Sequence, residues 1–588
     1  MCGIAGIVNF DGKVVKRNEL DKMNCMLVHR GPDGNGIWQD KCVGLAHSRL
    51  AIIDPEFGAQ PLCNDSETVI ISYNGEVYNY IELREELKAE FDFKTESDTE
   101  VVLRSYEKWG IDCLRRFRGM FAFALYNSTK SKLYLVRDRV GIKPLYYYYS
   151  PVCAVFCSEL LPIISLPYIK RKISHSGLCQ YFRYQYIPAP LTIYEDIYKL
   201  EPGHYLEIDT ITGRRENIKY WDIEAGIAEK TEEKWLDDLN GILDETMRMY
   251  VRSDVVFGAF LSGGVDSSLV SALMAKQMKE PVRTFTIGFS EQKHSETPYA
   301  RKASVFIGSD HYEKIVTPTL AEEMFAKIAQ HFGEPFGDSS AIPTYYVSKE
   351  AAESVKMVLS GDGGDELFCG YNSYQDTYKN IDEPQERHRQ LYNAQRQGFD
   401  TTMLKELFAN DLPVAEGISF SLKTKTDIDP VLFFQAQDFK TYLPGDVLTK
   451  VDRMSMAHSL EVRVPLLDHK IVEQAFTLPL SLRIRNNFLG RIKTKYLLKK
   501  SAERFYPSSF IERPKQGFGI PIVEWLRGPL QPIIESHLMD ARNPIYEWLN
   551  FDYVKAMLDD FTRGASGHAA RIWYVFVFSL WRKYVHQG

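Results

Sequence analysis

The stretch DVVFGAFLSGGVDSSLVSALMAKQMK, residues 254–279, decides the fold of the larger part of the chain. Apolar and β-branched residues lead into the glycine-rich turn SGGVDSS, and a helical pattern follows it. In such a unit the glycines let the backbone approach a phosphate, and free N–H groups at the helix start, with the serine hydroxyls, hold an anion. The turn lacks the lysine of GxxxxGKS/T, which excludes a mononucleotide P-loop.

A second glycine-rich turn occurs in VKMVLSGDGGDELFCGY, residues 355–371, again after a buried strand. It presents Asp362, Asp365 and Glu366, and the first turn presents Asp266. A carboxylate beside phosphates requires a cation between them, and Mg²⁺ is the usual one. Ligands of open α/β sheets bind outside the carboxyl ends of the strands, so the two turns predict a metal–pyrophosphate site. For the glycines alone, a plain strand–helix connection is the alternative.

The pattern of predicted secondary structure changes near residues 211–234. Before this polar stretch, short strand-like segments such as VIISYNGEVYNY and GMFAFALYN alternate with helical ones. After it, helical patterns dominate and alternate with buried strands such as VRTFTIGF, which predicts a parallel sheet. We therefore expect an α+β domain over 1–210, a connecting stretch over 211–234 and a mostly helical α/β domain over 235–588.

Composition restricts the class of protein. Lys+Arg 71 against Asp+Glu 78 gives a net charge of −7, which excludes a broadly basic nucleic-acid binder. The nine cysteines, an odd number, form no CxxC pair; scattered, unpaired cysteines indicate a reducing compartment. The apolar stretch over 572–581 has about ten residues, against the ~20 of a membrane-spanning helix. We expect a cytoplasmic protein that binds neither nucleic acid nor membrane.

Cys2 follows the initiator methionine directly. Removal of Met1 would leave a thiol nucleophile with its own α-amine as a base, as in N-terminal nucleophile catalysts. The alternative is a small buried residue at the start of a strand.

Three further segments offer groups that would suit such a nucleophile. Arg49 in HSRLAIID could hold a carboxylate through its planar fork or form a surface ion pair. Asn74 and Gly75 in YNGE either form a hairpin turn or place an amide and a backbone N–H at a developing oxyanion. Asp98 in ESDTEV lies in the first turn of a predicted helix, where it favours the helix dipole or pairs with a substrate ammonium.

Taken together, these segments resemble the glutaminase domain of class II glutamine amidotransferases, an N-terminal nucleophile hydrolase with an αββα sandwich. The segments that carry the resemblance span about 160 residues in the family's order: MCGIAGI, HRGPD, SRLAIID, GAQPL, YNGEVYN, ESDTE, GMFAFALY and RDRVGIKPLYY. The resemblance implies that Cys2 forms a glutamyl thioester and that Asn74 and Gly75 form the oxyanion hole. It further implies that Arg49, Asp98 and Glu76 bind the carboxylate, amine and amide region of glutamine, in that order.

The two glycine-rich turns resemble the ATP-pyrophosphatase synthetase fold. The order glutaminase then synthetase is similar to the glutamine-hydrolysing (type B) asparagine synthetase family, and LTKVDRMSMAHSLEVRVPLLD (448–468) and RPKQGFGIP (513–521) extend the match. The resemblance implies ATP as co-substrate with Mg²⁺, an acyl-adenylate, ammonia that travels inside the protein and, as in many relatives, a homodimer. The residues it implies for ATP are Leu261, Ser262, Gly264, Asp266, Ser267, Ser268, Ile287, Ser360 and Gly361. It also implies Asp266 and Asp365 for Mg²⁺, Lys515 for the adenylate-forming transition state and Asp362 as proton acceptor.

Two positions depart from the pattern of well-known asparagine synthetases. Asp362 stands where they have glutamate, and GEPFGDSSAIPTYY (333–346) lacks the arginine of their Thr-Thr-x-Arg run. The second departure predicts an acceptor pocket without that cation, although aspartate carries two carboxylates. Conversion of aspartate to asparagine, with release of AMP and pyrophosphate, is the favoured reading. Amidation of another carboxylate, such as a uronic acid in surface-polysaccharide biosynthesis, is the alternative, and a non-catalytic nucleotide-binding regulator is a distant third.

Overall fold

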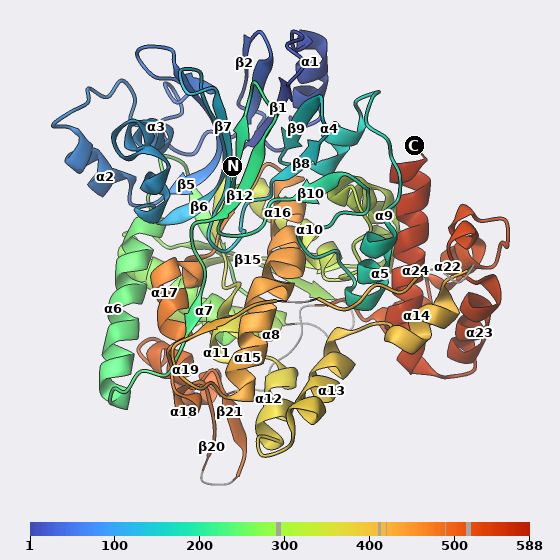
Figure 1. Cartoon of the computed structure of the whole chain (residues 1–588). Helices are drawn as coiled ribbons and strands as arrows, with labels where there is room; N and C mark the ends of the chain where they lie inside the picture. Colours follow the sequence, from blue (N-terminus) through green and yellow to red (C-terminus); the bar gives the residue numbers. More distant parts are fainter. Residues whose placement is uncertain (290–295, 410–412, 419, 488–489, 513–518, 588) are drawn as a thin grey trace.

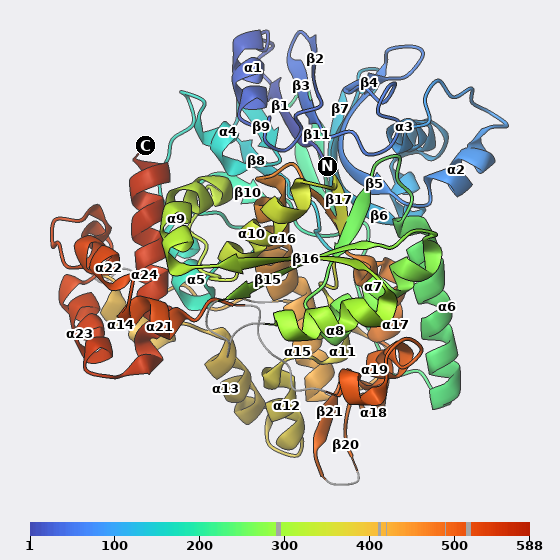
Figure 2. The same ribbon diagram turned by 180° about the vertical axis from the view of Figure 1, so that it is seen from behind.

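A computed structural model describes residues 1–289, 296–409, 413–418, 420–487, 490–512 and 519–587 (Figure 1). The N-terminal part lies at the top of the view, the strands and helices after residue 232 lie below it, and the C-terminal helices form one side. Figure 2 gives the same arrangement from behind.

The N-terminal part contains two antiparallel six-stranded sheets. The first has the order β10 (Ile197–Lys199), β8 (Tyr146–Tyr149), β9 (Cys153–Cys157), β1 (Gly3–Asn9), β3 (Val43–Arg49) and β2 (Gly34–Asp40). The second has the order β12 (Arg215–Lys219), β11 (His204–Asp209), β7 (Lys132–Arg137), β6 (Gly119–Asn127), β5 (Val69–Val77) and β4 (Leu62–Cys63).

Apolar side chains from the two sheets pack face to face, with Ile4 and Leu45 of the first sheet against Ile70 and Ala124 of the second. The outer face of the second sheet is covered by α2 (Tyr80–Leu87) and α3 (Asp98–Trp109), and α1 (Arg17–Cys25) packs on the first. The strands alternate their side chains between two faces, so each sheet can bury both. The predicted αββα sandwich is confirmed.

The larger part is built on a five-stranded sheet in which all neighbours are parallel. Its order is β16 (Asp310–Val316), β15 (Arg283–Phe289), β14 (Phe257–Phe260), β17 (Met357–Leu359) and β19 (Glu461–Arg463). The helices around it include α6 (Glu232–Tyr250), α7 (Val265–Gln277), α8 (Thr297–Ile307), α10 (Ala341–Ala352), α11 (Gly364–Phe368), α16 (Leu448–Met456), α17 (His469–Ala475) and α19 (Tyr496–Ala502). The predicted parallel sheet with many helices is therefore confirmed.

The C-terminal helices α21 (Ile522–Arg527), α22 (Gln531–Leu538), α23 (Phe551–Thr562) and α24 (Ala569–Trp581) gather at one side of the molecule in both views. The apolar stretch 572–581 belongs to α24, where ten of the thirteen residues are buried against protein. Among the described residues, no helix has both the length and the apolar character that a membrane crossing requires.

The stretch expected to connect the domains contains secondary structure. Strand β12 pairs with β11, so the second sheet continues past residue 210, and β13 (Glu224–Ala225) pairs with β18 (Lys423–Thr424) of the larger part. The residues of β12, RENIK, are mostly exposed and polar, as an edge strand allows. We propose a domain boundary between β12 and α6.

Two candidate active sites

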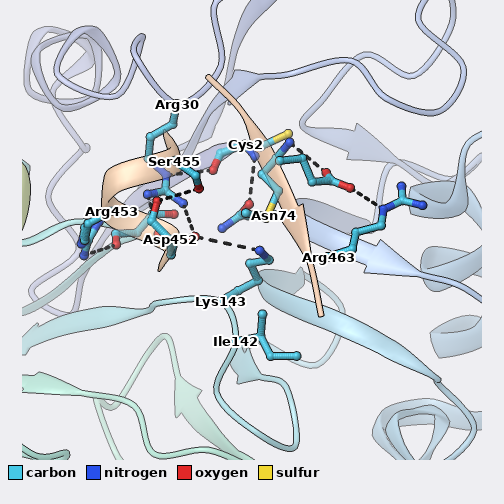
Figure 3. A network of polar contacts seen from close by, with 12 residues as sticks. Cys2, Arg30, Asn74, Ile142, Lys143, Asp452, Arg453, Ser455 and Arg463 are labelled. Carbon is cyan, nitrogen blue, oxygen red and sulfur yellow. Dashed lines mark hydrogen bonds and ion pairs between the residues drawn. The ribbon is translucent and has the colours of Figure 1, made fainter. Parts of the chain in front are cut away.

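The first site surrounds Cys2, which precedes β1 and is 7% exposed. The Cys2 backbone N–H donates to Asn74 Oδ1 at 2.9 Å, and its Sγ lies 3.8 Å from the Leu50 carbonyl oxygen (Figure 3). Burial raises the pKa of the Cys2 thiol, and the nearby N-terminal ammonium opposes that rise. The thiol therefore stays protonated unless a base takes its proton.

Asn74 and Gly75 lie inside β5, paired with Ala122 and Phe121 of β6. The alternative of a hairpin turn at this Asn-Gly is therefore wrong, because strand pairing in the folded protein overrides the local turn preference. A Cβ atom on Gly75 would lie 2.3 Å from the Met120 carbonyl oxygen, so only glycine fits here. The Nδ2 atom of Asn74 is buried and has no hydrogen-bond acceptor among the described residues.

Arg49 and Asp98 line the same cavity as Cys2 and Gly75. The guanidinium of Arg49 donates to carbonyl oxygens of residues 53–55, at 2.6 to 3.3 Å, so it does not form the surface ion pair weighed above. Asp98 begins α3 and accepts from the Tyr73 hydroxyl at 2.9 Å and the Val77 N–H at 3.0 Å. Burial raises the pKa of Asp98 to about 6.

Met1 also lines this cavity, whose volume is about 30 Å³. That volume is enough for a water molecule but not for an amino acid. Because Met1 is itself buried against these residues, its removal would enlarge the cavity at Cys2. Glu76 lies at the same cavity, and burial raises the pKa of its carboxyl group, with Asp98 adding to the rise.

A buried ionic network joins the two parts of the chain beside Cys2 (Figure 3). Arg30 donates to the Cys2 carbonyl oxygen at 3.1 Å and forms two hydrogen bonds with Asp452 of α16, at 2.8 and 3.1 Å. The Lys143 Nζ lies 3.9 Å from Asp452 Oδ1, and burial lowers the pKa of Lys143 to about 8. Side chains of the larger domain thus form part of the surroundings of Cys2.

The second site is a cavity of about 1030 Å³ between the two glycine-rich turns. The first turn connects β14 to α7 and the second connects β17 to α11, so both lie at carboxyl ends of parallel strands, as predicted. The predicted residues that line it are Leu261, Ser262, Gly264, Asp266, Ser267, Ile287, Ser360, Gly361, Asp362 and Asp365. Ser268 is buried in the first turn of α7 and is not among the lining residues, and Lys515 lies outside the described residues.

The two turns pack directly on each other. A Cβ atom on Gly361 would lie 2.5 Å from the Ser267 backbone nitrogen, and one on Gly364 would lie 2.5 Å from Asp266 Cγ. Only glycine permits this close approach. Within the first turn, Ser262 Oγ lies 3.0 Å from Ser267 Oγ and accepts from the Gly264 N–H at 3.2 Å.

Lys495 is a site residue that our sequence analysis missed. Its ammonium group contacts carboxylates of both turns, Asp266 and Asp365, and is 2.7 Å from Asp365 Oδ1. Burial opposes the charge on Lys495, but the two carboxylates raise its pKa above the usual lysine value. A signal was present in the sequence: Arg491, Lys493 and Lys495 alternate, so a strand would direct them to one face.

The carboxylates of Asp266 and Asp365 fit a divalent cation. They reach one common ammonium from two facing turns, so one ion at that position would have oxygen ligands from both. Mg²⁺ is commonly held by one or two carboxylates plus the phosphate oxygens of a substrate.

The region expected to bind the acceptor contains a lysine. Lys450 of α16 lies 2.8 Å from Asp338 Oδ2 and donates to Ser340 Oγ at 2.7 Å. Burial alone would raise the pKa of Asp338, but the Lys450 ammonium lowers it to about 2. Residues 338–343 contain no arginine, as noted from the sequence, but a helix about a hundred residues later in the chain brings the Lys450 ammonium to this region.

Asp362 accepts a hydrogen bond from the Ser360 hydroxyl at 2.6 Å, and burial raises its pKa. In the same cavity, the Arg396 guanidinium packs on the rings of Tyr371 and Tyr442, 4.4 and 4.3 Å from their centres. The cavity thus offers a carboxyl group of raised pKa, the cationic side chains of Lys450, Lys495 and Arg396, and the rings of Tyr371 and Tyr442.

Comparisons with known proteins agree with the order of the two domains. Residues 238–583 match the family model described as asparagine synthase, and residues 1–221 match that of the glutamine amidotransferase domain. Asparagine synthetase [glutamine-hydrolyzing] 1 of Bacillus subtilis (strain 168) is 34% identical, over 99% of this chain and 96% of its own length. Asparagine synthetase [glutamine-hydrolyzing] 3 of the same organism is 29% identical, over 93% and 89%. Amidase chry2 of Gibberella zeae is 27% identical, over 92% of each chain.

Proposed function

Because the chain belongs to the asparagine synthase family, we propose that it is a glutamine- and ATP-dependent amidotransferase whose acceptor is aspartate. The enzyme adenylates a carboxylate and amidates it with ammonia from glutamine. The observation that carries the proposal is the presence, in one chain, of a cavity at Cys2 and of a larger cavity between two glycine-rich turns.

In the glutaminase half, the Cys2 sulfur attacks the glutamine amide carbon, and the α-amine freed by loss of Met1 takes the thiol proton. That proton passes to the amide nitrogen, the C–N bond breaks and ammonia leaves; water then hydrolyses the glutamyl thioester, which releases glutamate and restores the thiol. The carbonyl oxygen becomes an oxyanion, which the Asn74 Nδ2 and the Gly75 N–H stabilise. Support comes from the buried Asn74 Nδ2, which has no acceptor among the described residues, because an orphaned buried donor is costly unless the reaction provides an acceptor. Arg49 and Asp98 hold the carboxylate and ammonium of glutamine.

In the synthetase half, ATP occupies the cavity between the two turns. An acceptor carboxylate oxygen attacks the α-phosphorus, the bond to the bridging oxygen breaks, and pyrophosphate leaves. The Lys495 ammonium contacts Asp266 and Asp365 in the same cavity; with Mg²⁺ in its place between the two carboxylates, it would turn to the phosphate oxygens and offset the negative charge that develops on them. A Mg²⁺ ion held by those two carboxylates would neutralise further phosphate charge.

Ammonia then attacks the acyl carbon, the C–N bond forms, and AMP leaves. Asp362 accepts the proton that the new amide nitrogen loses, and the burial that raises its pKa makes it a better base. Ammonia has to travel from Cys2 to this cavity. The buried side chains of Arg30, Lys143 and Asp452 lie at the interface between Cys2 and α16, which the ammonia would have to cross.

Aspartate as acceptor is supported by the pair Asp338 and Lys450. Besides the carboxylate that reacts, aspartate carries a second carboxylate and an ammonium group. Lys450 would bind that carboxylate, and Asp338 would bind the ammonium. A second candidate, amidation of a larger carboxylate such as a uronic acid, is favoured by one feature: the rings of Tyr371 and Tyr442, with the Arg396 guanidinium packed on them, add a further wall to the cavity.

An acceptor screen tests the proposal. Pyrophosphate release would be measured with MgATP and glutamine in the presence of aspartate or of nucleotide-sugar uronates. We expect pyrophosphate release with aspartate and none with the nucleotide-sugar uronates. Absence of release with aspartate would refute aspartate as the acceptor. Lys450→Met should raise the KM for aspartate and leave glutamine hydrolysis unchanged. Lys493→Met removes a partly exposed lysine of the same cavity and serves as the matched control.

A further inference from the structure

Strand β19 of the larger domain carries two buried charged side chains into the glutaminase site. Glu461 lines the cavity at Cys2, although it lies 460 residues from Met1 in the sequence. The strand is fixed at both ends, because the Glu461 N–H donates to the Lys356 carbonyl oxygen at 3.0 Å and the Arg463 carbonyl oxygen accepts from the Ser360 N–H at 2.9 Å. The sheet that carries the second phosphate turn therefore also positions these side chains.

Glu461 binds the N-terminal ammonium group. Its Oε2 lies 3.1 Å from the Met1 nitrogen, its Oε1 accepts from Arg463 Nε at 2.7 Å, and the residue is 1% exposed. Burial would raise the pKa of Glu461, but the ammonium and Arg463 together lower it to about 2. The carboxylate is ionised and faces the end of the chain from which the nucleophile comes.

Arg463 holds Glu76, the residue that follows Gly75 in β5. Its Nη2 lies 3.0 Å from Glu76 Oε2, and its Nη1 donates to the carbonyl oxygens of Tyr250 and Arg252 at 2.8 and 2.6 Å. The guanidinium is thus anchored on the larger domain, while Glu76 belongs to β5 of the glutaminase domain.

Loss of Met1 changes the charge balance around Glu461. The α-amine then belongs to Cys2, whose nitrogen already contacts Asn74 and whose thiol is close enough to Glu461 for the carboxylate to raise its pKa. A buried carboxylate is stable only when a cation or hydrogen-bond donors satisfy it. The α-amine of the processed Cys2, which lines the same cavity as Glu461, would provide such a cation.

We propose that Glu461 and Arg463 are positioning residues of the glutaminase, supplied by the synthetase domain. Glu461 orients the α-amine of the processed Cys2, and Arg463 fixes Glu76 and with it the oxyanion-hole segment of β5. The proposal rests on the glutaminase half of the function proposed above. It assigns to the larger domain a direct part in glutamine hydrolysis.

The test uses the full chain with Glu461→Gln and Arg463→Lys, each assayed for glutamate release from glutamine and for ammonia-dependent pyrophosphate release. Because the two residues orient reacting groups, kcat for glutamate release should fall about 10- to 100-fold while KM stays within about twofold. Ammonia-dependent pyrophosphate release should be retained. The matched control is Arg118→Met, which breaks a buried interdomain pair with Asp468 and Glu245 and lines neither cavity.

Each outcome decides for or against the positioning role. Native kcat in Glu461→Gln, or an equal loss in Arg118→Met, would overturn it, as would a parallel loss of ammonia-dependent release. If Arg463→Lys fails to fold, Glu461→Gln decides alone, because this substitution keeps the size of the side chain. The thermal midpoint of Glu461→Gln then shows whether that variant is folded. If the unmodified protein releases no glutamate, the proposed function fails instead, which separates the two failures.

Discussion

Replacement of Lys495 by methionine tests the second site most directly. The substitution keeps much of the side-chain volume and removes the ammonium group that contacts Asp266 and Asp365. Lys495 is only 6% exposed, so solvent cannot take over its role. The two carboxylates would then face each other without their shared cation.

Two magnitudes follow from this geometry. Breaking a buried ion pair by removing one partner costs about 3–5 kcal/mol of folding stability, and here two carboxylates lose one partner. Loss of one pre-positioned group that stabilises developing charge costs about 2.7–4 kcal/mol, or about 10²–10³ in kcat. We therefore expect pyrophosphate release to fall by that factor while glutamate release stays near the native rate.

The assay compares Lys495→Met with Lys493→Met, two residues away on the same wall of the cavity. Lys493 pairs with Glu512 and is 31% exposed, so its loss should cost no more than about 1 kcal/mol. Millimolar Mg²⁺ should raise the thermal midpoint of Lys495→Met more than that of the native protein, because the ion can take the vacated cationic position.

Two results would refute this reasoning. Pyrophosphate release by Lys495→Met within threefold of native would show that the ammonium does not act on the phosphates. Equal losses in the two lysine variants would show that general positive charge in the cavity, and not the position between the two carboxylates, is what matters.

Three further predictions concern the separate halves of the reaction. Cys2→Ala should abolish glutamine-dependent product formation and leave ammonia-dependent formation intact, as measured by amide product with each nitrogen source; intact glutamine-dependent activity would exclude Cys2 as the nucleophile. Asp266→Asn should abolish MgATP-dependent pyrophosphate release and keep glutamate release, so unchanged pyrophosphate release would remove the metal role from Asp266. The pKa of Asp98 is raised to about 6, so its carboxylate is mostly charged only above that pH. As Asp98 protonates below pH ~6, kcat/KM for glutamine should fall about tenfold per pH unit. A flat profile from pH 5 to 8 would contradict the role of Asp98 in binding an ammonium group.

The candidate sites illustrate which features local sequence can predict. The turns at 262–268 and 360–366 depend on glycines, serines and acids that are neighbours in the chain, so their chemistry is visible without the fold. The same holds for Cys2, which is distinguished by its place at the N-terminus. At Asn74 and Gly75 the local signal was ambiguous, and only pairing with β6 decided for strand over turn. Strand β12 escaped prediction because its exposed polar residues lack the alternation of a half-buried strand.

The sequence by itself determined the two domain types, their order and the acid-bearing turns, and it singled out Cys2 as the candidate nucleophile, because each depends on residues close together in the chain. Only the tertiary structure decided which distant residues complete the sites: Lys495 reaches Asp266 across 229 residues, and Lys450 reaches Asp338 across 112. It likewise brought Glu461 and Arg463 to the glutaminase site. A charged side chain carries no local signature of its partner, since the partner is selected by which strands and helices the hydrophobic core brings together.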